Sequence, residues 1–83
     1  MSKPRREPLG TRNIVGAKVT RLRKEKQMKQ KELAAKLQSM GMDISESSLS
    51  RLECQERLVQ DFELPILADV LGTTAADLLN NEE

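Results

Sequence analysis

The stretch SESSLSRLE, residues 45–53, gathers side chains that form hydrogen bonds but do little covalent chemistry. Serine hydroxyls both donate and accept, Glu46 accepts through its carboxylate, and Arg51 donates through a planar guanidinium. Leu49 and Leu52 are spaced to share one face of a helix. At about 100° per residue, four side chains then point away from that face: Ser47, Ser50, Arg51 and Cys54. Such a helix offers a surface for recognition rather than a catalytic centre.

The residue types that most enzyme chemistry needs are scarce in this chain. It has no histidine, so the commonest general base and the commonest transition-metal ligand are both missing. Cys54 is the single cysteine, which is too few for an ordinary zinc site or an internal disulfide. The carboxylates are spaced irregularly, as on solvated helix surfaces. We therefore predict no enzyme activity, no metal or other cofactor, and no small-molecule ligand.

The net charge of +1 hides a division between the two halves of the chain. Residues 1–36 contain twelve Lys and Arg against three Glu, a net of +9, whereas residues 37–83 carry a net of −8. The most basic segment is RLRKEKQMKQK, residues 21–31. Clustered Lys and Arg attract the phosphates of DNA, but a solvated helix face has a similar composition. Charge alone leaves both interpretations open.

Length and composition predict one small globular domain with an aliphatic core. The chain has 83 residues, and Phe62 is its only aromatic, so the stacking platform of single-strand and most RNA binders is absent. No apolar run approaches the roughly 18 residues of a membrane span, and the start MSKPRREPLG lacks the apolar centre of a signal peptide. We expect a cytoplasmic protein.

Hydrophobic spacing and capping residues predict an all-α fold without strands. The five expected helices cover about residues 13–26, 30–39, 45–54, 61–71 and 74–79. Their expected N-caps are Asn13, Ser45, Asp61 and Thr74, with Gly41 and Gly72 as stop signals. Their expected inward-facing residues are Val15, Val19, Leu22, Leu33, Ala34, Leu37, Leu49, Leu52, Leu64, Leu67, Val70 and Leu71.

The chain is expected to divide into three parts. Residues 1–12 contain Pro4, Pro8 and Gly10 among basic residues, which predicts a flexible basic N-terminal arm. Residues 13–80 form the helical domain, and residues 81–83 a short C-terminal tail. Only the middle part carries the periodic apolar pattern of a folded unit.

Several motifs occur in register along residues 13–80. Gln30 opens the second expected helix, Ala34 is small where two helices cross, and SRLE at 50–53 closes the third helix. LG at 71–72 and DLL at 77–79 complete the series. Together they resemble the phage-repressor-like helix-turn-helix family (Cro/cI, or xenobiotic-response-element). The resemblance implies a compact five-helix lambda-repressor-like DNA-binding domain whose recognition helix, residues 45–54, lies in the major groove.

The resemblance also implies base contacts from Glu46, Ser47 and Arg51, and helical geometry adds Ser50. Arg51 can bind the O6 and N7 of a guanine, a contact that gives about 1–3 kcal/mol of discrimination. Glu46 can accept from a cytosine N4, or it can simply complement the helix dipole. Ser47 and Ser50 can reach bases, phosphates or bridging waters.

Phosphate contacts are expected at the start of the second helix, which this fold lays across the DNA backbone. Gln30 resembles the family's phosphate-contacting glutamine, and Lys29 precedes it; Lys31 and Arg21 are weaker candidates. Three arginines of the N-terminal arm could enter a minor groove or stay in solvent: Arg5, Arg6 and Arg12.

Three features depart from the family pattern. The turn QSMGMDI, residues 38–44, is longer than usual, which leaves the angle of the recognition helix undetermined. Lys29 replaces the usual Ser or Thr cap. ECQER, residues 53–57, replaces a basic, glycine-containing segment. Glu53 itself is expected to be structural, paired with a nearby base such as Arg57, and the carboxylates around Cys54 disfavour a redox-sensing thiol.

The leading hypothesis is a sequence-specific transcriptional regulator that occupies an operator in double-stranded DNA, for example as a repressor. A homodimer on two half-sites roughly 34–36 Å apart would double the contact. Candidate dimer residues are Phe62, Ile66 and Leu79. Two alternatives remain: a protein-interaction module, such as an antitoxin or an accessory subunit of another regulator, and a non-specific nucleic-acid binder.

Overall fold

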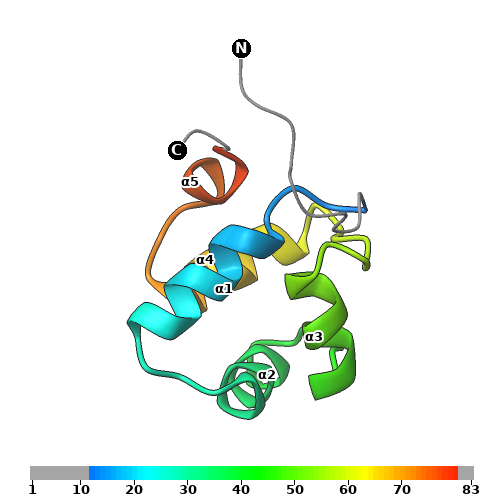
Figure 1. Cartoon of the computed structure of the whole chain (residues 1–83), viewed down its shortest axis with the longest axis vertical. Helices are drawn as coiled ribbons and strands as arrows, with labels where there is room; N and C mark the ends of the chain where they lie inside the picture. Colours follow the sequence, from blue (N-terminus) through cyan, green and yellow to red (C-terminus); the bar gives the residue numbers. More distant parts are fainter. Residues whose placement is uncertain (1–11, 81–83) are drawn as a thin grey trace.

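Five short helices make up most of the computed structural model, which describes residues 12–80 (Figure 1). They are α1 (Gly16–Glu25), α2 (Gln30–Ser39), α3 (Glu46–Glu53), α4 (Glu63–Leu71) and α5 (Ala75–Leu79). The described part of the chain contains no strand, so the all-α prediction is confirmed. No helix among these residues is long and apolar enough to cross a membrane.

The core is aliphatic, as the composition requires. Its buried side chains are Val15, Val19, Leu33, Ala34, Leu37, Met42, Ile44, Leu49, Leu52, Leu67, Ala68, Leu71 and Leu78. Three residues predicted to face inward, Leu22, Leu64 and Val70, are only partly buried and pack against the edge of this core. The spacing of apolar residues therefore identified most of the inner face of α1 to α4, but the burial of Ala68, Met42 and Ile44 was not predicted.

Side-chain caps begin two helices as predicted. Ser45 Oγ accepts the N–H of Ser48 at 3.0 Å, and Thr74 Oγ1 accepts the N–H of Asp77 at 3.0 Å. Asn13 also binds free N–H groups, those of Val15 and Gly16, at 3.1 and 2.8 Å. It does so from a turn before the helix, which begins at Gly16 rather than at Asn13.

The predicted cap at Asp61 is wrong. Helix α4 begins at Glu63, and its N-cap residue, Phe62, makes no side-chain cap bond. The Glu63 carboxylate instead accepts the N–H of Gln60 at 2.9 Å. Arg57 donates to both oxygens of the same carboxylate, so Glu63 binds the chain before α4 at two places.

The helices are arranged around α1 and α4, which lie alongside each other at the centre of Figure 1. Helices α2 and α3 pack against one another and against this pair, and α5 packs on α4 at the opposite end. The start of α1 lies directly on the end of α3, because a Cβ at Gly16 would collide with the Leu52 carbonyl oxygen. Only glycine permits this close approach.

The long turn between α2 and α3 is fixed to the core. Met42 and Ile44 are 2% and 3% exposed, so alternate residues of the turn are buried. Gly41 adopts a φ of 95°, a conformation that favours glycine. Gln38 Nε2 donates to the Ile44 carbonyl at 2.6 Å. The extra residues therefore form an anchored turn that delivers the chain to Ser45.

Candidate nucleic-acid interface

Helix α3 presents one apolar and one polar face. Leu49 and Leu52 are fully buried, and they fix the helix against α1 and α2. On the opposite face Ser47 and Arg51, one helical turn apart, are exposed, and so is Glu46 in the first turn. The polar surface expected from the sequence is therefore present.

Two predicted members of this surface differ in accessibility. Ser50 is half-buried, so its hydroxyl is less accessible than that of Ser47. Cys54 is exposed at the C-cap of α3, and it is a free thiol. Among the four predicted base-contacting residues, Glu46, Ser47 and Arg51 are the open ones.

The start of α2 provides the predicted basic residues beside α3. Lys29 and Lys31 are exposed, and Gln30 between them is half-buried. Lys29 caps nothing with its side chain, but its own N–H is accepted by Glu32 Oε1 at 2.8 Å. Glu32 thus stabilises a helix start that the sequence left without a conventional cap.

The other predicted basic contacts have different surroundings. The Arg21 side chain is 60% exposed on α1 and lies 3.7 Å from Glu25 in a pair one helical turn apart. Arg12 is also exposed, while its backbone N–H donates to the Gln55 carbonyl at 2.9 Å. Arg5 and Arg6 lie outside the described residues.

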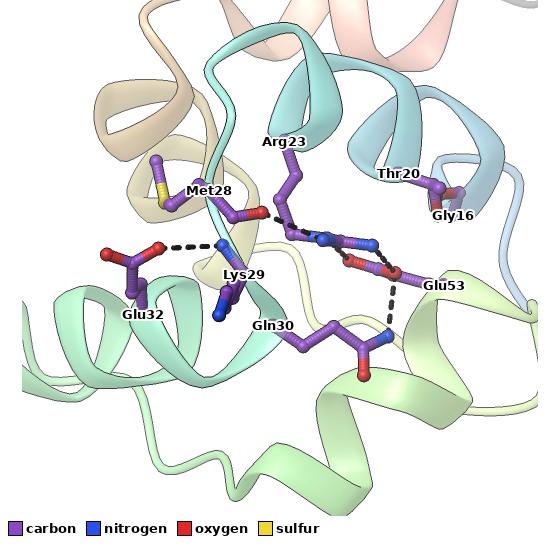
Figure 2. Close-up of polar contacts among 8 residues, drawn as sticks. All are labelled: Gly16, Thr20, Arg23, Met28, Lys29, Gln30, Glu32 and Glu53. Carbon is purple, nitrogen blue, oxygen red and sulfur yellow. Dashed lines mark hydrogen bonds and ion pairs between the residues drawn. The ribbon is translucent and has the colours of Figure 1, made fainter.

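A buried carboxylate connects three elements of this region (Figure 2). Glu53 Oε2 accepts from Arg23 Nε at 2.7 Å, and Oε1 accepts from Arg23 Nη2 at 3.1 Å. The same Oε1 accepts from Gln30 Nε2 at 2.9 Å. Arg23 Nη1 also donates to the Met28 carbonyl at 2.9 Å. Glu53 thereby joins the end of α3 to α1 and to the first residue of α2. Arg23 extends this network to the connection between α1 and α2.

Glu53 is structural as predicted, but its expected partner is wrong. Arg57 does not bind Glu53; it donates to both carboxylate oxygens of Glu63, at 3.1 and 3.2 Å. Burial raises the pKa of Glu63, but the hydrogen bonds from Arg57 and from the Gln60 N–H, with the charge of Arg57, outweigh it and lower the pKa overall.

The internal role of Arg23 was not predicted, because the sequence places this residue in the basic segment 21–31. Its side chain is 12% exposed, and its charge is neutralised internally by Glu53. The charge of Lys18 is also paired within the protein. Its Nζ donates to the Asp77 carbonyl at 3.0 Å and lies 3.6 Å from the Asp77 carboxylate. The exposed basic surface is therefore smaller than the charge count of residues 1–36 indicates.

The segment after α3 uses a glutamine in a backbone conformation that favours glycine. Gln55 has a φ of 64° and is 1% exposed. Its Nε2 donates to the Asn13 carbonyl at 3.0 Å, and Asn13 Nδ2 donates to the carbonyls of Leu52 and Arg57. These bonds hold the entry to α1 against the exit from α3, where the family pattern has a glycine-containing segment.

The fold and the polar surface together define a helix-turn-helix protein. The model of the helix-turn-helix family HTH_3 matches residues 19–78. This range includes α2, the turn and α3, and it covers most of the chain. The chain therefore belongs to this family.

A solved structure gives a more particular likeness. The clp gene regulator ClgR from Corynebacterium glutamicum superposes with a TM-score of 0.71 at 32% sequence identity. The similarity covers 88% of this chain and 71% of that one. A comparison with curated proteins found no match.

Proposed function

We propose that this protein is a sequence-specific DNA-binding transcriptional regulator that places α3 in the major groove of an operator. The observation that carries the proposal is the exposed set of Ser47, Arg51 and Glu46 opposite two buried leucines. Family membership and the likeness to a gene regulator support it. This arrangement leaves hydrogen-bonding side chains free for base edges while the other face anchors the helix.

Each exposed side chain of α3 has a distinct proposed role. Arg51 donates to the O6 and N7 of a guanine, and Ser47 binds a base or a bridging water. Glu46 accepts from a cytosine N4 in the first turn of the helix. Ser50, being half-buried, contributes a weaker contact. Arg51 is therefore the main determinant of sequence preference.

The proposed phosphate contacts flank α3. Lys29, Gln30 and Lys31 lie at the start of α2, which packs on α3, so both would approach the same duplex. Arg21 adds a more distant contact. Arg12, together with Arg5 and Arg6 in the proposed arm of residues 1–12, would enter the neighbouring minor groove.

A second copy of the chain is the proposed partner on a two-fold symmetric operator. Exposed apolar residues occur in the connection between α3 and α4 and on α5, with Phe62 65%, Leu58 60% and Leu79 44% exposed. A shallow groove of about 270 Å³ between the start of α1 and α5 is lined partly by Ile14 and Leu79. Ile66 is partly buried in the core, so it is a weaker candidate than Phe62 or Leu79.

The test is selection of bound duplexes from a random library at near-physiological salt. The wild type should enrich a two-fold symmetric site, and Arg51→Ala should relax one guanine-containing position. Lys36→Ala is a matched control, because Lys36 is an exposed base on α2 outside the proposed contacts. It should enrich the same site as the wild type.

Absence of enrichment by the wild type would overturn the proposal. The exposed pair Leu58 and Phe62, beside the exposed acids Glu56 and Asp61, would then favour the protein-interaction alternative. Equal affinity for all duplexes, unchanged in Arg51→Ala, would instead favour non-specific binding through the basic residues.

A further inference from the structure

The hydrogen bond between Gln30 and Glu53 defines the orientation of the Gln30 amide. A carboxylate only accepts, so the nitrogen of the amide must be the atom that faces it. Figure 2 shows this nitrogen directed at Glu53 and the amide oxygen directed away from it. One N–H of the amide is thus used, and the other N–H remains available to a second acceptor.

The position of this amide matters for DNA binding. Gln30 is the first residue of α2, where the backbone N–H groups of the first turn have no acceptor within the helix. These groups and the helix dipole make the end of α2 attractive to a phosphate. A side-chain N–H held beside them would add one donor in a fixed direction.

Glu53 is itself held rigidly enough to impose that direction. Its side chain is 5% exposed, and both carboxylate oxygens accept from Arg23. Arg23 is fixed in turn by the Met28 carbonyl, at the residue that precedes Lys29. The carboxylate therefore belongs to a network anchored in α1, and Gln30 is attached to its outer edge.

The same network complements the long turn. Residues 38–44 join the end of α2 to the start of α3, and Gln38 bonds across that turn. The Gln30–Glu53 bond joins the opposite ends, the start of α2 and the end of α3. The two helices are thus fastened at both ends, although the turn between them is longer than the family pattern.

We propose that Glu53 is a positioning residue for DNA binding, which orients the Gln30 amide so that its second N–H donates to a DNA phosphate. This inference rests on the proposed function, since it assumes that the start of α2 faces DNA. Glu53 does not touch the DNA. It acts by fixing the direction of a neighbouring donor and the spacing between α2 and α3.

The test is a double-mutant cycle on operator binding with Gln30→Ala and Glu53→Gln. Glu53→Gln keeps the shape of the side chain, but the new amide can donate or accept, so the orientation of Gln30 is no longer imposed. In the wild type Gln30→Ala should weaken binding about tenfold, as expected for a hydrogen bond to a charged group. In the Glu53→Gln background the same change should weaken binding less than about threefold.

Gln60→Ala is the matched control, because Gln60 is an exposed glutamine in the α3–α4 connection. It should leave affinity unchanged in both backgrounds. Circular dichroism should show that each variant is folded at the temperature of the binding assay. Equal losses from Gln30→Ala in both backgrounds would overturn the inference while leaving the proposed function intact.

Nuclear magnetic resonance of the wild type gives a second measurement that does not depend on the folding of Glu53→Gln. In the free protein one side-chain amide proton of Gln30 should be shifted by its bond to Glu53. Addition of operator should shift the other proton. Absence of the first shift, or operator binding without the second, would overturn the inference. A wild type that binds no duplex would instead overturn the proposed function.

Discussion

Two buried glutamates, Glu53 and Glu63, use the same chemistry for different purposes. Their side chains are 5% and 6% exposed, and each carboxylate accepts two hydrogen bonds from one arginine guanidinium, one at each oxygen. Glu53 joins α3 to Arg23, 30 residues earlier in the chain, and also to Gln30. Glu63 joins Arg57, six residues earlier, and the N–H of Gln60. One pair therefore holds helices together across the fold, while the other closes a local connection.

The difference shows that burial of an ion pair does not by itself tell its structural role. The Glu53 pair is the more enclosed one, because Arg23 is 12% exposed and Arg57 is 22% exposed. It also lies beside the proposed DNA-binding elements, whereas the Glu63 pair lies beside the exposed apolar residues Leu58 and Phe62 in the sequence. Substitutions at the two sites should therefore differ in size and in what they affect.

The largest effect is expected for Glu53→Ala. The change leaves the buried charge of Arg23 without its partner and removes the acceptor of Gln30, so we expect a loss of about 3 kcal/mol in the free energy of unfolding. Urea denaturation followed by circular dichroism measures this loss. A loss below about 1 kcal/mol would show that the pair behaves as a solvent-exposed one.

An intermediate effect is expected for Glu63→Gln, and it should depend on pH. Because its pKa is lowered on folding, ionised Glu63 stabilises the protein above the pKa of the unfolded chain. That contribution is lost as the pH falls through the folded-state pKa, which lies below the ordinary glutamate value. Glu63→Gln should therefore lose less stability than the wild type between pH 6 and pH 3. Urea denaturation of both proteins across this pH range measures the difference. The same fall in the free energy of unfolding for the wild type and Glu63→Gln would contradict the prediction.

The smallest effect on stability is expected for Arg21→Ala. Both partners of the Arg21–Glu25 pair are about 60% exposed. Loss of this ion pair should therefore change the free energy of unfolding by less than about 0.5 kcal/mol. If Arg21 binds a phosphate, Arg21→Ala should reduce the slope of log K for operator binding against log salt concentration by about one unit. Denaturation and binding titrations over a range of salt measure the two effects. An unchanged slope would remove Arg21 from the proposed interface.

The sequence was sufficient where local rules decide the structure. The bounds of α2 and the caps at Ser45 and Thr74 follow from apolar spacing and from side chains that bind N–H groups three residues ahead. The exposed face of α3 follows from the burial of Leu49 and Leu52 alone. These features need no information about distant parts of the chain.

The sequence was insufficient where several residues compete for one partner. Arg57 is the nearest base after Glu53, but packing brings Arg23 from α1 to that carboxylate and leaves Arg57 to Glu63. The Glu63 carboxylate also binds the N–H of Gln60, and Asp61 does not cap α4. Which acid meets which base depends on how the helices cross, and charge counts do not contain that information.

The bond between Arg12 and Gln55 has a consequence for the arginines that precede it. Gln55 follows the C-cap of α3 directly, so the chain before Arg12 starts beside the end of this helix. Arg6 lies six residues before Arg12, and a fully extended chain of that length spans at most about 20 Å. If α3 occupies an operator as proposed, Arg5 and Arg6 would therefore be present near the DNA at a high effective concentration. Under that proposal, contacts from the arm that are individually weak would still add to the affinity for DNA.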